Sequence, residues 1–333
     1  MGSSRFSTFC IISLLVLVAA VGSGCSWYNR VMAQKNLVDG AQAYNQRHFE
    51  EATENFRRAV AYDPDGNMLE SRTAQLFLAR TLHSLFAGNR RDKSKAKEAI
   101  VEYKKALPGY LKAIADNRAA VEASPDDEKA KSTLKENQSI IGSIVRSIGS
   151  LHENLGQTDK WREWQVKSSE NEGLPNDVRA NALISLAAKK YACANDISDA
   201  KEVKKTVQKD GKSVFKYSKP EADEDFETLT KCVEDGTGYI DRAIKLNGKS
   251  DSAWSYRASL LDQKMRIAEM EGNTDERSEL EKSKEEATAK FKELAKIKKE
   301  KQEEEARKKA EEEAKKDGGK KKESSDQDAK EDK

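Results

Sequence analysis

The stretch from residue 36 to residue 64, NLVDGAQAYNQRHFEEATENFRRAVAYDP, constrains the fold of this chain more than any other feature. Its small and aromatic residues recur at regular intervals and a proline closes it: Gly40, Phe49, Ala52, Phe56, Ala59 and Pro64. Gly40 and Ala52 would allow two helices to approach closely, because neither carries a large side chain. Phe49 and Phe56 would then fill the groove between these helices. The final proline ends the second helix, because it cannot donate a backbone hydrogen bond.

This pattern resembles the tetratricopeptide repeat, a helix–turn–helix unit of about 34 residues. Such units stack into a solenoid whose concave face usually binds another protein. The resemblance implies an all-α, tetratricopeptide-like solenoid of helical hairpins over residues 30–295. A second match lies at Trp254 and Ala258, which fit the opening aromatic and small residues of the family, although Gly248 stands where the closing proline is expected.

Apolar residues spaced three and four apart predict further helices along the body. The clearest covers residues 127–155 and ends at Gly156, as a helix with a C-terminal glycine cap would. Trp161 and Trp164 open the next helix on one face, and we expect them to fill the core. An earlier helix is expected to break at Pro108-Gly109. The pattern predicts about five to six helical hairpins in all.

Residues 203–217 interrupt the helical pattern with a predicted β-hairpin. Two runs rich in β-branched and aromatic residues flank Asp210-Gly211, a pair suited to a two-residue turn. An isolated hairpin is only marginally stable in water, so we expect this one to lean on the helices or on a partner. It is either a contact arm or an insertion tolerated in a surface loop.

Residues 296–333 form a separate, highly charged segment with almost no apolar residues. Glutamates stand four residues before lysines or arginines, as in Glu304 and Lys308, and such pairs support an exposed helix. We expect a solvated charged helix that ends at Gly318-Gly319, followed by a disordered tail.

The N-terminal residues 1–25 read as a targeting segment. Arg5 precedes the apolar run of residues 6–21, and small residues lead from that run to Cys25. This order resembles a bacterial lipoprotein signal, which implies lipidation of Cys25. The family prefers an aliphatic residue three positions before the cysteine, and Gly22 departs from that preference. The alternatives are an uncleaved membrane anchor and an ordinary cleaved signal. All three predict membrane targeting, with the bulk of the protein outside the cytoplasm, and in the periplasm if the source is bacterial.

Two cysteines lie in the body, Cys193 and Cys232. In an exported protein they would form a disulfide if their helices are neighbours, or else remain separate buried side chains. No Cys/His cluster suggests a metal site, and no nucleotide-binding or hydrolase motif suggests an enzyme or a cofactor. The formal net charge of +2, with acidic and basic residues interleaved along the sequence, argues against a nucleic-acid partner.

These features favour a membrane-tethered, protein-binding scaffold of the cell envelope, which binds an unnamed protein through a tetratricopeptide-like groove and takes no small-molecule substrate. The alternatives are a structural spacer that sets a distance and binds nothing, and an enzyme of unrecognised type.

Overall fold

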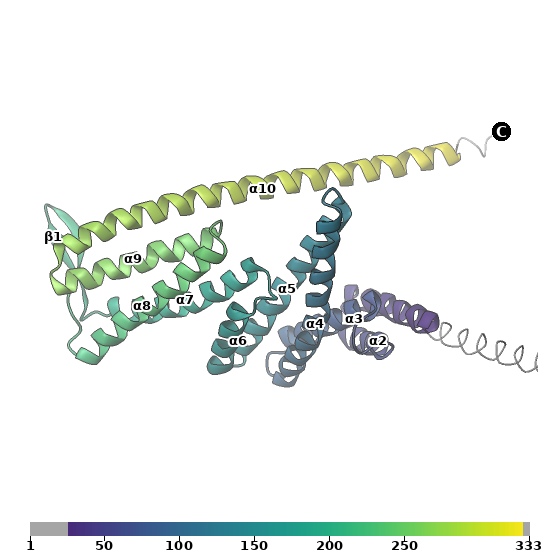
Figure 1. Cartoon of the computed structure of the whole chain (residues 1–333), viewed down its shortest axis with the longest axis horizontal. Coiled ribbons are helices and arrows are strands. Elements are labelled where there is room, and N and C mark those ends of the chain that lie inside the picture. The colour runs from purple at the N-terminus through teal and green to yellow at the C-terminus, as the bar shows by residue number, and fades with distance from the viewer. Residues whose placement is uncertain (1–25, 329–333) are drawn as a thin grey trace, which may run out of the picture. The chain divides into compact units, whose positions relative to one another are not determined.

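The computed structural model describes residues 26–328, which form an all-α chain with one small β-hairpin (Figure 1). The expectations for residues 1–25, including lipidation of Cys25, lie outside the described residues. Residues 26–45 are helical, and the elements that follow are α2 (Phe49–Ala61), α3 (Leu69–Gly88), α4 (Lys93–Ala123), α5 (Glu128–Asn154), α6 (Thr158–Glu170), α7 (Asn176–Ser198), β1 (Lys204–Lys209), β2 (Lys212–Tyr217), α8 (Asp223–Leu246), α9 (Asp251–Glu271) and α10 (Thr274–Asp328).

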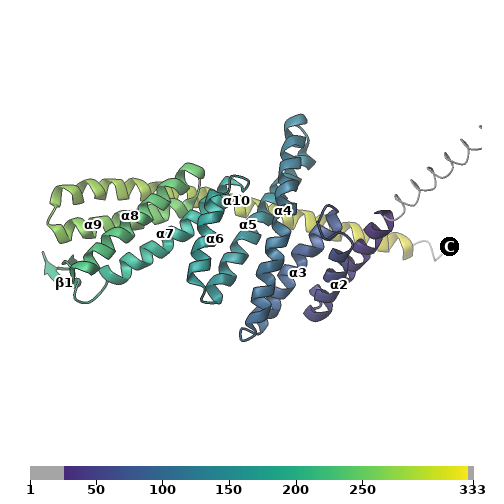
Figure 2. The ribbon, with the colours of Figure 1, turned by 60° about the horizontal axis from the view of Figure 1, so that its bottom comes forward.

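Successive helices pack as hairpins, which gives the tetratricopeptide-like arrangement predicted from the sequence. The chain divides into two compact units, the first reaching Val178 and the second starting at Arg179. In the first unit α2 packs on α3, α3 on α4, α4 on α5 and α5 on α6, and Figure 2 shows these neighbours side by side. One apolar core runs through this unit.

The first hairpin shows why the spacing in residues 36–64 matters. Ala52, Phe56 and Ala59 are completely buried. A Cβ atom built on Gly40 would lie 2.7 Å from the Phe56 ring, so the ring occupies the space that the glycine leaves open. Phe49 is half-buried and meets the Tyr44 ring edge-on, 5.5 Å between centroids. The helix ends at Ala61, before Pro64, which is exposed.

The expected break at Pro108-Gly109 is wrong, because α4 continues through both residues to Ala123. Proline removes one hydrogen bond from a helix. Buried side chains on both sides of it, Tyr103 and Ala106 before and Tyr110 and Ile114 after, pack into the same core. Their packing holds the two halves in one helix despite the missing bond.

The second unit is built on α7, α8, α9 and α10. The structure joins Cys193 of α7 to Cys232 of α8 in a disulfide, with 6.2 Å between their Cα atoms. A Cβ atom on Gly236 of α8 would lie 2.9 Å from Leu260 of α9, so these two helices approach closely there. Ala253 of α9 is completely buried, whereas Trp254 and Ala258 are half-buried.

The predicted β-hairpin is present, with β1 and β2 antiparallel. Asp210 and Gly211 form its turn with positive φ angles of 49° and 73°, as a two-residue hairpin turn requires.

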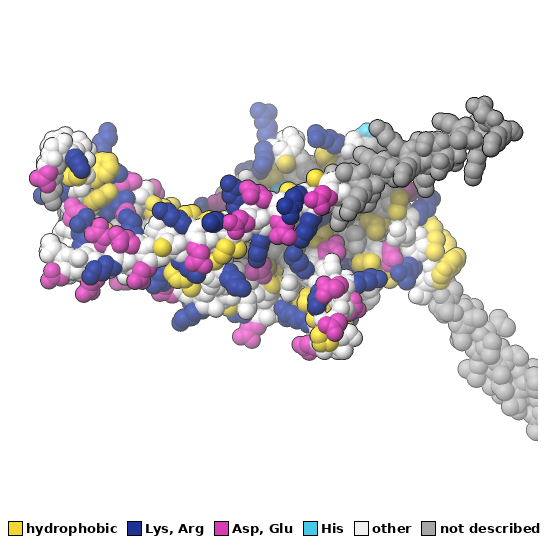
Figure 3. All heavy atoms as spheres, turned by 90° about the horizontal axis from the view of Figure 1, so that it is seen from above, with side chains coloured by type: hydrophobic (Ala, Val, Ile, Leu, Met, Phe, Trp, Pro, Cys, Tyr) yellow, Lys and Arg dark blue, Asp and Glu magenta, His cyan; other side chains and the backbone are white. Residues whose placement is uncertain are grey.

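The last helix, α10, packs on α9 through buried Ala287 and Leu294. Beyond this region Lys/Arg and Asp/Glu side chains intermingle along its exposed surface (Figure 3). The expected end at Gly318-Gly319 is wrong, because the helix runs on to Asp328. Within residues 26–328 no helix is both long and apolar enough to cross a membrane.

Candidate functional site

A groove opens between α4 and α6 in the first unit, beside the C-terminal end of α5. From α4 the side chains of Lys97, Ile100, Lys104 and Leu107, together with Pro108, line one wall. The spacing of three, four and three places these four side chains on one helical face. From α6 Lys160, Glu163, Trp164 and Lys167 line the other wall, and their spacing of three, one and three also keeps them on one helical face. His152 and Gln157 close one end.

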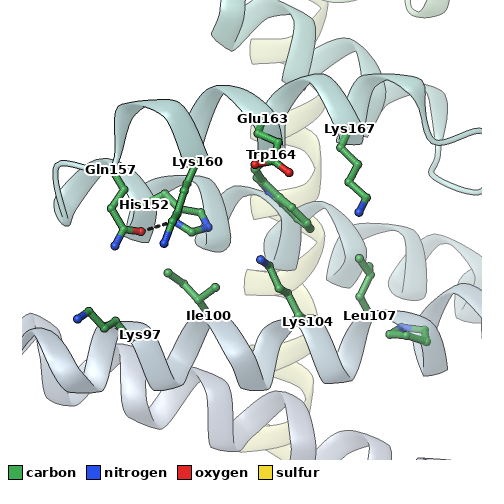
Figure 4. A pocket seen from close by; sticks show the side chains of 11 residues that line it. Lys97, Ile100, Lys104, Leu107, His152, Gln157, Lys160, Glu163, Trp164 and Lys167 are labelled. Carbon is green, nitrogen blue, oxygen red and sulfur yellow. Dashed lines mark hydrogen bonds between the residues drawn. The ribbon is translucent and has the colours of Figure 1, made fainter.

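The groove has a volume of about 790 Å³. Figure 4 shows Lys104, Lys160 and Lys167 pointing into the space between the two helices. The ammonium nitrogen of Lys104 lies 5.5 Å from the centroid of the Trp164 ring. The indole nitrogen of Trp164 donates a hydrogen bond of 3.0 Å to the carbonyl oxygen of Val145 on α5, which fixes the ring as part of the wall.

His152 adds no positive charge to this groove near neutral pH. Burial lowers the pKa of its imidazole below the ordinary value. The nearby positive charges of Lys104 and Lys160 lower the pKa further, although the hydrogen bond with Gln157 opposes this shift. The Nδ1 atom lies 2.8 Å from the side-chain oxygen of Gln157, so the neutral ring donates its Nδ1–H to that oxygen.

The groove therefore carries an excess of positive charge. Four lysines against one glutamate leave a formal charge of +3. Within the first unit, over residues 26–178, no carboxylate lies within ion-pairing distance of Lys97, Lys104, Lys160 or Lys167. Elsewhere in the same unit lysines do have such partners, as in Lys105 with Glu102 and Lys112 with Asp116. Unpaired ammonium groups beside apolar and aromatic walls suit a ligand that brings both carboxylates and apolar side chains.

The residues singled out in the sequence do not converge on this groove. Gly40, Phe49, Ala52, Phe56, Ala59 and Pro64 belong to the first hairpin or its C-terminal end, while Trp254, Ala258, Cys193 and Cys232 lie in the second unit. Of the tryptophan pair expected in the core, Trp161 is buried, whereas Trp164 is half-buried and lines the groove.

The sequence did not single out the groove lysines, because acidic and basic residues are interleaved along the chain. A signal was nevertheless present: on α4 lysine and aliphatic residues share one face, and on α6 Lys160, Trp164 and Lys167 do the same. When the residues of α4 and α6 are grouped by helical face instead of by position in the sequence, each helix shows lysines and apolar residues on the same face.

No known protein family matches this chain, and no curated protein matches it. Among solved structures, a monomeric mutant of IFIT1 with Gppp-AAAA shares 12% sequence identity with this chain at a TM-score of 0.28. The match covers 69% of this chain and 46% of the IFIT1 chain. At this identity and score the likeness does not carry a ligand from one protein to the other.

Proposed function

We propose that this protein is a membrane-tethered, protein-binding scaffold of the cell envelope, and that the groove between α4 and α6 binds an acidic segment of a partner protein. The observation that carries the proposal is the set of four groove lysines that have no carboxylate partner within the first unit, residues 26–178. The partner's carboxylates would approach these ammonium groups. Its apolar side chains would pack on Trp164, Ile100 and Leu107.

A test of the groove is affinity capture with the full chain. In the variant that combines Lys104→Glu with Lys160→Glu, the partner's carboxylates would meet like charges instead of ammonium groups. Loss of one charge-assisted contact weakens binding by about 1.5 to 3 kcal/mol, so we expect capture of the partner to fall at least about tenfold. Higher salt should weaken capture by the wild type, because both lysines are exposed.

The matched control combines Lys35→Glu with Lys129→Glu, two exposed lysines of the same unit outside the groove. It should retain the partner like the wild type, and both variants should keep the wild-type thermal midpoint. If the groove variant captures the same protein equally well, the groove is not the binding site. If the wild type captures no specific protein from envelope extracts, the structural spacer becomes the better interpretation.

The tether rests on the sequence order of an apolar run, small residues and Cys25. With lipidation, the intact mass of the purified protein should correspond to a chain that starts at Cys25 and carries added acyl mass. Cys25→Ala should remove this acyl mass. A mass that retains residues 1–24 would instead mean an uncleaved anchor, and an unacylated, shortened chain would mean a secreted protein without a tether.

A further inference from the structure

The β-hairpin is almost entirely solvent-exposed and has an unusual charge. Residues 204–217 contain five lysines and one aspartate, a formal charge of +4, whereas the whole chain carries +2. The base of the hairpin is held where Ser218 donates a hydrogen bond of 2.9 Å to the carbonyl oxygen of Val203. In Figure 1 it stands at one end of the second unit, next to α9. A two-stranded hairpin with so little packing is marginal on its own.

The two faces of the hairpin differ. On one face the Tyr217 ring lies 4.7 Å from the guanidinium of Arg266 on α9, and the ammonium of Lys204 lies 4.3 Å from the Phe215 ring. Side chains alternate along a strand, so Lys205, Val207, Val214 and Lys216 lie on the opposite face. All four are exposed or half-buried there.

On that outer face the register places Lys205 directly opposite Lys216. Like charges opposite each other in an antiparallel pair destabilise it. Among the side chains that the structure describes in the second unit, neither lysine has a carboxylate within ion-pairing distance. An anion bound at this face would relieve the repulsion.

The hydrogen-bond pattern shows which backbone groups are available. Bonded and non-bonded pairs alternate in an antiparallel ladder, and Val203 with Ser218 is a bonded pair. The backbone groups of Thr206 and Gln208 on β1 therefore point away from β2. At the corresponding position of β2, the N–H of Tyr217 donates to a carboxylate oxygen of Glu269 at 3.1 Å, which agrees with this alternation.

The two edges are not equivalent, because α9 packs against β2. In the described sheet no strand pairs with the outer edge of β1. The backbone groups of this edge lie next to the face that carries Lys205, Lys216 and the pair Val207–Val214. Strand addition supplies backbone hydrogen bonds, and alternate side chains of the added strand supply specificity.

We propose that the β1 edge binds an extended, acidic segment of a partner protein as a third strand, with its carboxylates on the face of Lys205 and Lys216. This site is separate from the groove between α4 and α6 and does not depend on it. Third-strand pairing would occupy the outward groups of Thr206 and Gln208, while the carboxylates would neutralise the facing lysines.

The test measures hydrogen exchange of the full chain with a probe peptide of alternating Glu and Val residues. Its carboxylates all lie on one face when it is extended. We expect the probe to protect residues 204–208, and a peptide of alternating Lys and Val to give no protection. Thr206→Pro removes an outward N–H without breaking the β1–β2 ladder, so it should weaken probe binding at least about tenfold.

The matched control is Ser213→Pro, which removes the equivalent outward N–H from the β2 edge and should leave binding unchanged. If Thr206→Pro unfolds the hairpin, Lys216→Glu serves instead. That change turns the repulsive pair with Lys205 into an attractive one, which favours the hairpin, yet it should weaken probe binding.

Four results would overturn the proposal. The first is no protection by the Glu–Val peptide at any concentration. The second is equal protection by the Lys–Val peptide. The third is unchanged probe binding in the variant that keeps its hairpin folded. The fourth is protection by vesicles of anionic phospholipid but not by the peptide, which would assign the hairpin to a membrane surface.

Discussion

Replacing Phe56 with alanine is expected to lower the free energy of unfolding of the first unit by about 3 to 5 kcal/mol. The Phe56 ring is completely buried, fills the space left open by Gly40, and lies 5.6 Å from the Phe77 ring of α3. Its removal leaves a cavity between two helices that the rigid hairpin cannot fully close. Because repeats are stabilised by their neighbours, the loss should spread to α3. Denaturant unfolding measures the free energy, and hydrogen exchange shows where protection is lost.

Phe49→Ala is the matched control, since it removes the same side chain from a half-buried position of the same helix. Phe49→Ala should lower the free energy of unfolding clearly less than Phe56→Ala does. Residues 36–64 should keep most of their protection from hydrogen exchange. Equal, small losses in both variants would contradict the packing of the first hairpin and, with it, the tetratricopeptide-like arrangement.

On the chain-entropy model of loop closure, loss of the disulfide between Cys193 and Cys232 should lower the free energy of unfolding of the second unit by about 4 kcal/mol. The bond closes a loop with a sequence separation of 39 residues and thereby restricts the unfolded chain. It also joins α7 to α8 next to a small core that includes Leu229 and Val233. The variant that combines Cys193→Ala with Cys232→Ala should show this loss in denaturant unfolding. Protection from hydrogen exchange should fall in α7 and α8.

A reducing agent provides the control for the disulfide. It should lower the stability of the wild type toward that of the double-alanine variant and leave the variant itself unchanged. Unfolding of the first unit should be the same in all three samples. A wild type that is unaffected by reduction would mean that the two cysteines are not bonded in the purified protein.

Local sequence pattern was enough to predict the helices, the first hairpin and the β-turn. Each of these depends on residues close together in the chain: Gly40 and Phe56 on adjoining helices, or Asp210 and Gly211 in one turn. The prediction failed at Pro108, where a local helix-breaking signal is outweighed by side chains packed on both sides of it. It failed again at Gly318, where α10 continues.

The sequence by itself determined the helical-hairpin architecture, the β-hairpin and the apolar faces of the helices. The side chains of one face recur every three or four residues in a helix and every two in a strand, so the spacing of nearby residues is enough to predict them. The tertiary structure alone decided which faces meet. It joined Cys193 to Cys232, and it brought Lys104 and Lys160 to one groove although acidic residues separate them along the chain. Among the described residues, it also left the outer edge of β1 without a neighbouring strand, whereas α9 packs against β2. Such contacts depend on how whole helices pack against each other, which the spacing of residues within one helix does not encode.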